Sequence, residues 1–318
     1  MQKIAAAVIA VSFASATAPA LAAQPTIPII VKDTTDYYWR VVLAGARKAG
    51  KDLNVNVPEL GAQSEADVNA EISTLSDAVL LKPAAVVIAP SQPQAVGKAI
   101  DDAAKRVKVI GVDSPADTKA FASQLMTDNA AAGRIAADAL GDAIKEKYGK
   151  AEGDVALVAS AASGATEQRA KGFKDEIAAK YPGLKLTAEK VGDGQSATAA
   201  KAVSDLIGAN TNLRGVFSSG AIATAGVGQA LADAKKSDAI KAIGFGSDPT
   251  IVKLLQDGTL SGVVVEDPFR MGYDGIKTAL AVSKGEQVPA TIDTGAELVT
   301  KANMDSSRSQ ELLNPKIR

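Results

Sequence analysis

The sequence predicts an α/β protein of two similar lobes, each a parallel β-sheet covered by helices on both faces. Short continuous apolar runs alternate with helical patterns along most of the chain, which is typical of strands buried in a parallel sheet. The alternation falls into two sets of similar size, although no exact repeat is present. At 318 residues the chain is also too long for one ordinary hydrophobic core, so two domains are expected.

The first set predicts a βα alternation from Thr26 onward. Apolar, β-branched runs predict strands at 27–31, 55–57, 85–88, 107–112 and 121–126. Pro28 fits the first of these because it stands at the very start of the strand. Helical patterns occupy 38–51, 64–81 and 94–105. We expect Ser64 to start the second of these helices, with Asp67 as an acidic residue of its first turn.

The second set begins near Asp128 and repeats the pattern. Strands are predicted at 154–159, 184–191, 215–218, 242–245 and 262–265, and helices at 129–147, 163–180, 196–207, 221–235, 249–257 and 270–284. Tyr181-Pro182-Gly183 is a strong stop for the second of these helices. Because no Pro-, Gly- or Ser-rich linker separates the two sets, we expect several short crossings between the lobes rather than one tether.

The first 22 residues are predicted to be a secretory signal peptide. Lys3 supplies the positive charge, 4–13 the apolar region, and Ala20-Leu21-Ala22 the small residues before cleavage at Ala23. No later segment approaches about 18 uninterrupted apolar residues, so no membrane insertion is expected. The chain has no cysteine to carry a lipid anchor or a disulfide. We therefore expect a free protein of a bacterial periplasm, stabilised by burial alone.

The composition excludes several classes of function. The chain has neither histidine nor cysteine, which removes zinc sites and Cys/His catalysis. Its net charge of −1 argues against a nucleic-acid surface. No Gly-x-Gly-x-x-Gly opens a helix after a strand, and Gly192-Asp193-Gly194-Gln195 is only a fragment of a calcium loop, which we interpret as a turn. We expect no metal, no cofactor and no catalytic residue.

The segment 33–39 (DTTDYYW) is the most distinctive candidate site. It follows the first predicted strand and holds three of the chain's twelve aromatic residues, including its only tryptophan. Open α/β sheets bind ligands in loops after the carboxyl ends of parallel strands, and aromatic faces beside carboxylates there suit a small polar molecule. From these residues alone, packing of Tyr38 and Trp39 into the core remains an equal alternative.

Further segments occur in an order and spacing that resemble a known family. They are 36–46 (DYYWRVVLAGA), 85–91 (AVVIAPS), 109–114 (VIGVDS), 127–133 (TDNAAAG), 215–218 (GVFS) and 243–246 (IGFG). Together they resemble the type I periplasmic solute-binding proteins, specifically the ribose-binding-protein family of sugar ABC importers. The likeness covers nearly all of the expected mature chain.

The resemblance implies two Rossmann-like lobes joined by three hinge strands, with a ligand held between them. The N-terminal lobe would comprise 23–127 and 267–296, and the C-terminal lobe 128–266 and 297–318. The hinges would fall near Thr127, Glu266 and Gly295.

The resemblance also implies ligand contacts, which this chain keeps unevenly. Tyr38 and Trp39 take the places of the aromatic pair that sandwiches a sugar ring, and Asp113 keeps the carboxylate that holds sugar hydroxyls. Two positions that usually carry arginine are Ser114 and Glu167 here. The other expected contacts replace the family's usual polar residues or stand beside them: Asp36, Ser91, Arg169, Gly220, Ser247 and Glu266.

These replacements predict a cleft rich in carboxylates. The acids are Asp33, Asp36, Asp113, Glu167 and Glu266, with Arg169 and Lys32 as the nearest positive groups. Such a set would repel a sugar phosphate or a sugar acid, so we expect a neutral or an amine-bearing solute. Three of the acids have a structural alternative, Asp113 as a turn cap, Glu167 as a helix-dipole acid and Glu266 as part of a hinge turn.

The preferred function is capture of a small polar solute, a sugar, polyol or amino-bearing sugar-like compound, by a monomeric binding protein. The lobes would close over it by hinge rotation and deliver it to the permease and ATPase of an ABC importer. A sensor that presents the closed form to a chemoreceptor or histidine kinase differs only in its partner and remains open. A hydrolase using paired carboxylates such as Asp36 and Asp113 lacks a tuned acid–base pair.

Overall fold

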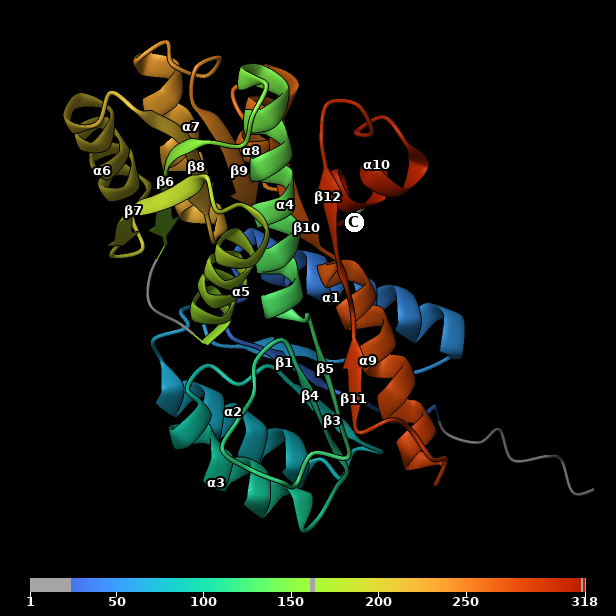
Figure 1. The fold of residues 1–318 in the computed structure, drawn as a ribbon. Helices are drawn as coiled ribbons and strands as arrows, with labels where there is room; N and C mark the ends of the chain where they lie inside the picture. Colours follow the sequence, from blue (N-terminus) through green and yellow to red (C-terminus); the bar gives the residue numbers. More distant parts are fainter. Residues whose placement is uncertain (1–23, 161–163, 316, 318) are drawn as a thin grey trace, which may run out of the picture.

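The computed structural model describes residues 24–160, 164–315 and 317, which form two α/β lobes (Figure 1). Each lobe contains one six-stranded sheet. The predicted signal peptide at 1–22 lies outside the described residues. No helix in the described part of the chain is long and apolar enough to cross a membrane.

The sheet of the first lobe has the order β11-β5-β4-β3-β1-β2 and is parallel throughout. Its strands are β1 (Ile29–Val31), β2 (Glu59–Gly61), β3 (Val86–Ile88), β4 (Val109–Val112), β5 (Ser123–Met126) and β11 (Thr291–Asp293). Its helices are α1 (Tyr37–Leu53), α2 (Val68–Leu80), α3 (Pro93–Ala104) and α9 (Pro268–Ser283). Alternate side chains point to opposite faces, so Ile110 and Val112 pack with α1 and α9 while Val109 packs with α2 and α3.

The sheet of the second lobe has the order β12-β10-β9-β8-β6-β7. Its strands are β6 (Gly153–Ala159), β7 (Leu184–Val191), β8 (Leu213–Ser218), β9 (Lys241–Phe245), β10 (Gly262–Glu266) and β12 (Ala296–Val299), of which only β12 is antiparallel, against β10. Helices α4 (Asn129–Tyr148) and α5 (Gly164–Lys180) cover one face. The other face is covered by α6 (Ser196–Ala209), α7 (Ala221–Asp233), α8 (Pro249–Gln256) and α10 (Ser307–Leu313).

The described chain passes between the two sheets three times. It crosses after β5, again between β10 and α9, and finally between β11 and β12. The first and third crossings are joined by hydrogen bonds, because the hydroxyls of Thr127 and Thr294 lie 3.3 Å apart and the Thr294 amide donates to the Met126 carbonyl at 2.9 Å. Gly295 has a φ of +79°, a conformation that any side chain would strain.

Two local predictions are wrong. The run 55–57 forms only an isolated bridge between Asn56 and Thr26, and the strand begins later, at Glu59. Val55 is buried beneath α1, so its apolar character reflects helix packing rather than sheet membership. Asp67, and not Ser64, starts α2, and it is the N-cap rather than a first-turn residue, since its carboxylate accepts the Ala70 amide and the helix begins one residue after it.

Candidate functional site

A cavity of about 460 Å³ lies between the lobes at the carboxyl ends of their strands. Its lining includes Lys32, Asp33, Asp36, Tyr37, Tyr38, Trp39, Glu65 and Asp113 from the first lobe, and Ser160, Arg169, Gly220, Ala221, Ile222, Phe245, Gly246, Ser247 and Asp248 from the second, with Val265, Glu266 and Pro268 at a crossing. Another cavity, of about 480 Å³, lies at the amino ends of β6 and β8 and is lined by the second lobe alone. Only the first has the interlobe position expected of a closing cleft.

Most of the residues expected to contact ligand line this cavity. Those that do are Asp36, Tyr38, Trp39, Asp113, Arg169, Gly220, Ser247 and Glu266. Three others do not. The Ser91 amide donates to the Glu71 carboxylate, and Glu167 is exposed in the first turn of α5. Ser114 lies behind the wall, hydrogen-bonded to Asp113.

Asp113 and Lys32 form an ion pair in the wall of the first lobe. Lys32 Nζ lies 2.7 Å from Asp113 Oδ2 and 2.6 Å from Ser114 Oγ. Burial raises the pKa of Asp113, but Lys32 and the hydroxyl donors lower it by more, so the carboxyl remains an anion. Burial likewise lowers the pKa of Lys32, and Asp113 with the more distant Glu65 raises it above its ordinary value. Each group therefore holds the other in its charged form.

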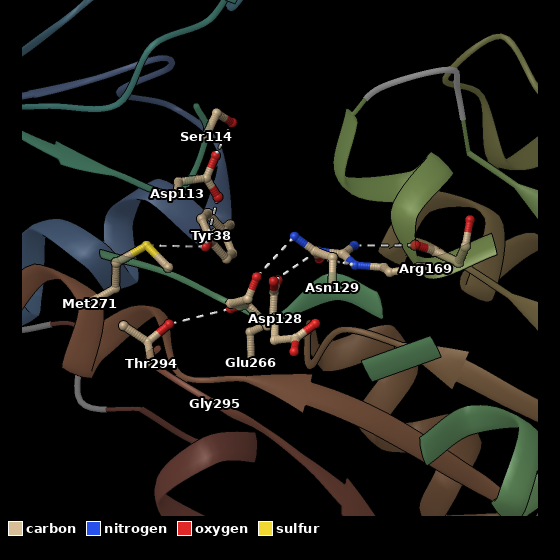
Figure 2. A network of polar contacts seen from close by, with 12 residues as sticks. Tyr38, Asp113, Ser114, Asp128, Asn129, Arg169, Glu266, Met271, Thr294 and Gly295 are labelled. Carbon is tan, nitrogen blue, oxygen red and sulfur yellow. Dashed lines mark hydrogen bonds and ion pairs between the residues drawn. The ribbon is translucent and has the colours of Figure 1, made fainter. Parts of the chain in front are cut away.

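Tyr38 brings a third donor to the same carboxylate. Its hydroxyl donates to Asp113 Oδ1 at 3.0 Å and lies 3.6 Å from the sulfur of Met271 (Figure 2). Burial and the adjacent Asp113 raise the pKa of Tyr38 well above its ordinary value, so the phenol remains a donor. The three donors orient Asp113, which follows β4 with a φ of +67°.

Trp39 combines a core position with an edge on the cavity. Its side chain is 2% exposed within the α1–α9 core, and its Nε1 donates to Glu65 Oε1 at 2.8 Å. The Tyr38 and Trp39 rings meet edge to face, with centroids 4.9 Å apart and planes at 86°. These two rings therefore do not face one another across a gap. The half-buried Tyr37 also lines the cavity, together with Phe245 at the end of β9.

Arg169 and Glu266 form the second ion pair, where the second lobe meets a crossing. Arg169 Nη2 donates to Glu266 Oε1 at 2.8 Å, and its other nitrogens donate to Asn129 Oδ1 and the Ser219 carbonyl (Figure 2). Its guanidinium lies over the Phe245 ring, 3.5 Å from the centroid. Burial raises the pKa of Glu266 above its ordinary value, and the attraction of Arg169 offsets this only in part.

The cavity is rich in carboxylates, as the sequence predicts, but its two positive side chains are bound in ion pairs with two of these acids. Six carboxylates and two cations line it, and both cations are paired with its most buried acids. The other acids have local roles, since Asp36 and Asp248 cap α1 and α8 and Glu65 accepts from Trp39. No group of three or more metal-ligating side chains occurs among the residues that the structure describes.

Sequence reasoning missed several lining residues, among them Tyr37, Phe245 and Glu65. Tyr37 belongs to the aromatic segment 33–39. The orientation of α1 about its own axis decides which aromatic side chains of that segment reach the cavity, and the sequence does not give this orientation. Phe245 ends a buried strand, which was a usable signal, because neighbouring strand ends share one edge of a sheet. Glu65 lies in a loop before α2 and carried no signal.

Comparisons with known proteins agree on one family. Residues 27–287 match the family model of the periplasmic binding protein domain. The solved structure of a carbohydrate transporter solute-binding protein from Agrobacterium radiobacter, in complex with D-arabinose, is 58% identical, with a TM-score of 0.85 and coverage of 92% of this chain and 100% of that chain.

More distant relatives agree with this. An ABC transporter solute-binding protein from Agrobacterium vitis with bound D-fucose is 32% identical, with a TM-score of 0.78 and coverage of 91% of this chain and 99% of that chain. The ribose import binding protein of Escherichia coli is 28% identical over 302 residues, or 95% of this chain and 99% of that protein. The chain therefore belongs to the periplasmic binding protein family, as a solute-binding protein of a sugar ABC importer rather than an enzyme.

Proposed function

We propose that this protein binds a neutral monosaccharide, an aldopentose such as D-arabinose, in the interlobe cavity. The observation that carries the proposal is an interlobe cavity whose deepest acids are already paired with Lys32 and Arg169. Paired groups keep free lone pairs and protons for sugar hydroxyls without requiring a charged ligand. The relative that shares 58% of its sequence was solved with D-arabinose, which supports a pentose.

The lining suggests a division of roles. Asp113, Lys32 and Arg169 would exchange hydrogen bonds with ring hydroxyls, and Tyr37 and Tyr38 would cover apolar faces of the sugar. The edge of Trp39 would complete the apolar surface, while Asp36, Gly220, Ser247 and Glu266 would close the rim and floor. Ser114 would act indirectly by orienting Asp113.

The lobe boundaries are part of the proposal. We assign 23–127 and 267–296 to one lobe and 128–266 and 297–318 to the other. Sheet membership supports this division, because β11 pairs in the first sheet and β12 in the second. Rotation about the three crossings would open and close the cavity.

The family implies a periplasmic location and a cognate permease. We further propose that residues 1–22 are removed before Ala23, that the mature protein is a monomer, and that an ATPase drives the permease. The relatives are described as transporter components, which favours import over sensing. An intact mass measured on protein recovered from the periplasm tests the cleavage point, and multi-angle light scattering tests the monomer.

Titration calorimetry tests the ligand. D-Arabinose and its epimers should bind, whereas an amino sugar and a sugar acid should bind at least about tenfold more weakly. That ratio is about 1.4 kcal/mol of binding free energy. Stronger binding of the amino sugar would favour an amine-bearing ligand, and stronger binding of the sugar acid would contradict the proposed electrostatics. The sugar should be recovered unchanged after binding.

A further inference from the structure

We propose that Arg308 is a positioning residue for lobe closure. It connects the C-terminal helix α10 to two of the three crossings and thereby favours the arrangement in which both lobes line one cavity. The inference rests on the closure included in the proposed function and adds a structural element that controls it.

Arg308 joins residues that directly follow two crossings. Its Nη1 lies 2.8 Å from Asp267 Oδ2, and its Nε lies 2.7 Å from Glu297 Oε1. Asp267 begins the passage into the first lobe and caps α9 through the Arg270 amide. Glu297 lies on β12, two residues after Gly295, and belongs to the sheet of the second lobe. One guanidinium therefore links an element of each lobe beside the hinge.

The base of Arg308 is fixed to the second lobe. Helix α10 buries Leu312 and Leu313 in the core of that lobe, where they are 4% and 1% exposed. The Asp267 side chain is only 9% exposed, whereas that of Arg308 is 40% exposed. Because α10 is fixed in the second lobe and the Asp267 side chain is buried, neither partner can move far when the lobes rotate. The ion pair is therefore expected to respond to their relative position.

Asp267 is also adjacent in the chain to residues that line the cavity. Its neighbour Glu266 lines the cavity and holds Arg169 through the second ion pair. A displacement of Asp267 would therefore shift Glu266 and, through it, the guanidinium over Phe245. This adjacency connects α10, which lies outside the cavity, to the groups that face the ligand.

The chain makes another contact with the first lobe after α10. The carbonyl of Ile317 accepts from Arg47 Nη1 on α1 at 3.1 Å, and Arg47 is itself held by Glu59 on β2 at 2.7 Å. Helix α10 packs in the second lobe. Arg308 within it and Ile317 after it nevertheless both contact residues of the first lobe. Two separate contacts therefore connect this end of the chain across the lobes.

The central test is a set of variants at the ion pair. Asp267→Asn keeps a side-chain oxygen to cap α9 and removes the charge that Arg308 requires. Arg308→Ala removes the cation, and Arg308→Lys should restore part of the effect because it can still pair with Asp267. Glu311→Gln is the matched control, since Glu311 lies on the same helix, 3.6 Å from Arg308, and belongs to the second lobe.

Lobe separation can be measured without a sugar. The chain contains no cysteine, so Lys98→Cys on α3 and Lys201→Cys on α6 would give one labelling site on each lobe. Both lysine side chains are exposed, at 84% and 76%. Single-molecule energy transfer between the labels should show a larger open fraction for Arg308→Ala and Asp267→Asn than for the parent and for Glu311→Gln.

D-Arabinose affinity provides the second measurement. The two ion-pair variants should bind about two- to fivefold more weakly, with partial recovery in Arg308→Lys, because an ion pair whose arginine is partly exposed makes a modest contribution to a conformational balance. The double variant should bind no more weakly than either single one. Equal open fractions in all variants would overturn the proposal, even if thermal stability fell. Failure of the parent protein to bind D-arabinose would count against the pentose alone.

Discussion

At the scale of single residues, Asp113 determines the polarity of the first-lobe wall. It accepts from Lys32, Ser114 and Tyr38 and adopts a positive φ that asparagine also tolerates. Asp113→Asn should keep the backbone shape but leave Lys32 buried without its counter-charge. We expect a loss of about 3 kcal/mol in the free energy of unfolding, measured by urea denaturation.

The same substitution should weaken sugar binding at least about tenfold, because it removes an ionised acceptor. The control is Asp102→Asn on α3, whose acid forms exposed pairs with Lys98 and Lys105. Stability and affinity should be nearly unchanged in that variant. Equal losses in the two variants would contradict a special role for Asp113.

Glu266 predicts a dependence of stability on pH. Burial raises its pKa above the ordinary value of 4.5, so the folded chain takes up this proton before the unfolded chain does. The contribution of Glu266 to stability therefore increases as the pH falls through the folded pKa, and it is complete below 4.5. Glu266→Gln removes that contribution.

Urea denaturation across a pH series measures the difference. The stability of the parent protein relative to Glu266→Gln should rise as the pH falls from neutral toward 4.5. It should then level off. A difference that is constant with pH, or that falls over this window, would show that Arg169 rather than burial dominates the titration.

Position along a strand predicted many of the cavity residues but not their orientation. Asp113 and Glu266 end buried strands, and the aromatic segment follows β1, so their edge of the sheet could be inferred. Ser91 has a similar place after β3, yet its amide is bound by Glu71 of α2. Side-chain direction and partners from other elements decide such cases, and a linear pattern does not contain them.

At the scale of secondary structure, α1 and α9 pack closely through glycines. A Cβ on Gly272 would lie 1.9 Å from the Val42 carbonyl oxygen, and one on Gly45 would lie 1.9 Å from that of Phe269. Gly272→Ala should therefore separate the helices and reduce stability by about 1–3 kcal/mol. Thermal and urea denaturation measure the loss.

Gly208→Ala is the matched control for this prediction. Gly208 lies within α6, where an added Cβ would meet nothing within 4 Å. Alanine is favoured over glycine in a helix by up to about 1 kcal/mol, so this variant should be as stable as the parent or more stable. A similar loss in both variants would mean that helix contact is not the cause.

Burial explains which elements the sequence could predict. The central strands β3, β4, β8 and β9 are almost wholly buried and stood out as apolar runs. The edge strands β2 and β11 are short and partly exposed, and their composition resembles that of loops. The antiparallel β12 and the short α10 likewise offered no periodic signal.

At the scale of the whole molecule, ligand binding should be visible as stabilisation and compaction. A sugar present at about 100 times its dissociation constant adds about 2.7 kcal/mol to the free energy of unfolding. The radius of gyration from small-angle X-ray scattering should decrease in the same titration, because closure brings the lobes together. Stabilisation without compaction would indicate binding to lobes that are already closed.

The third crossing has a consequence for the order of folding. Residues 291–299 supply an edge strand to each sheet, so neither lobe has its complete sheet until nearly the whole chain has been made. A late segment that supplies a strand to each of two sheets delays the completion of both. The crossing between β11 and β12 therefore couples the completion of the two sheets during folding.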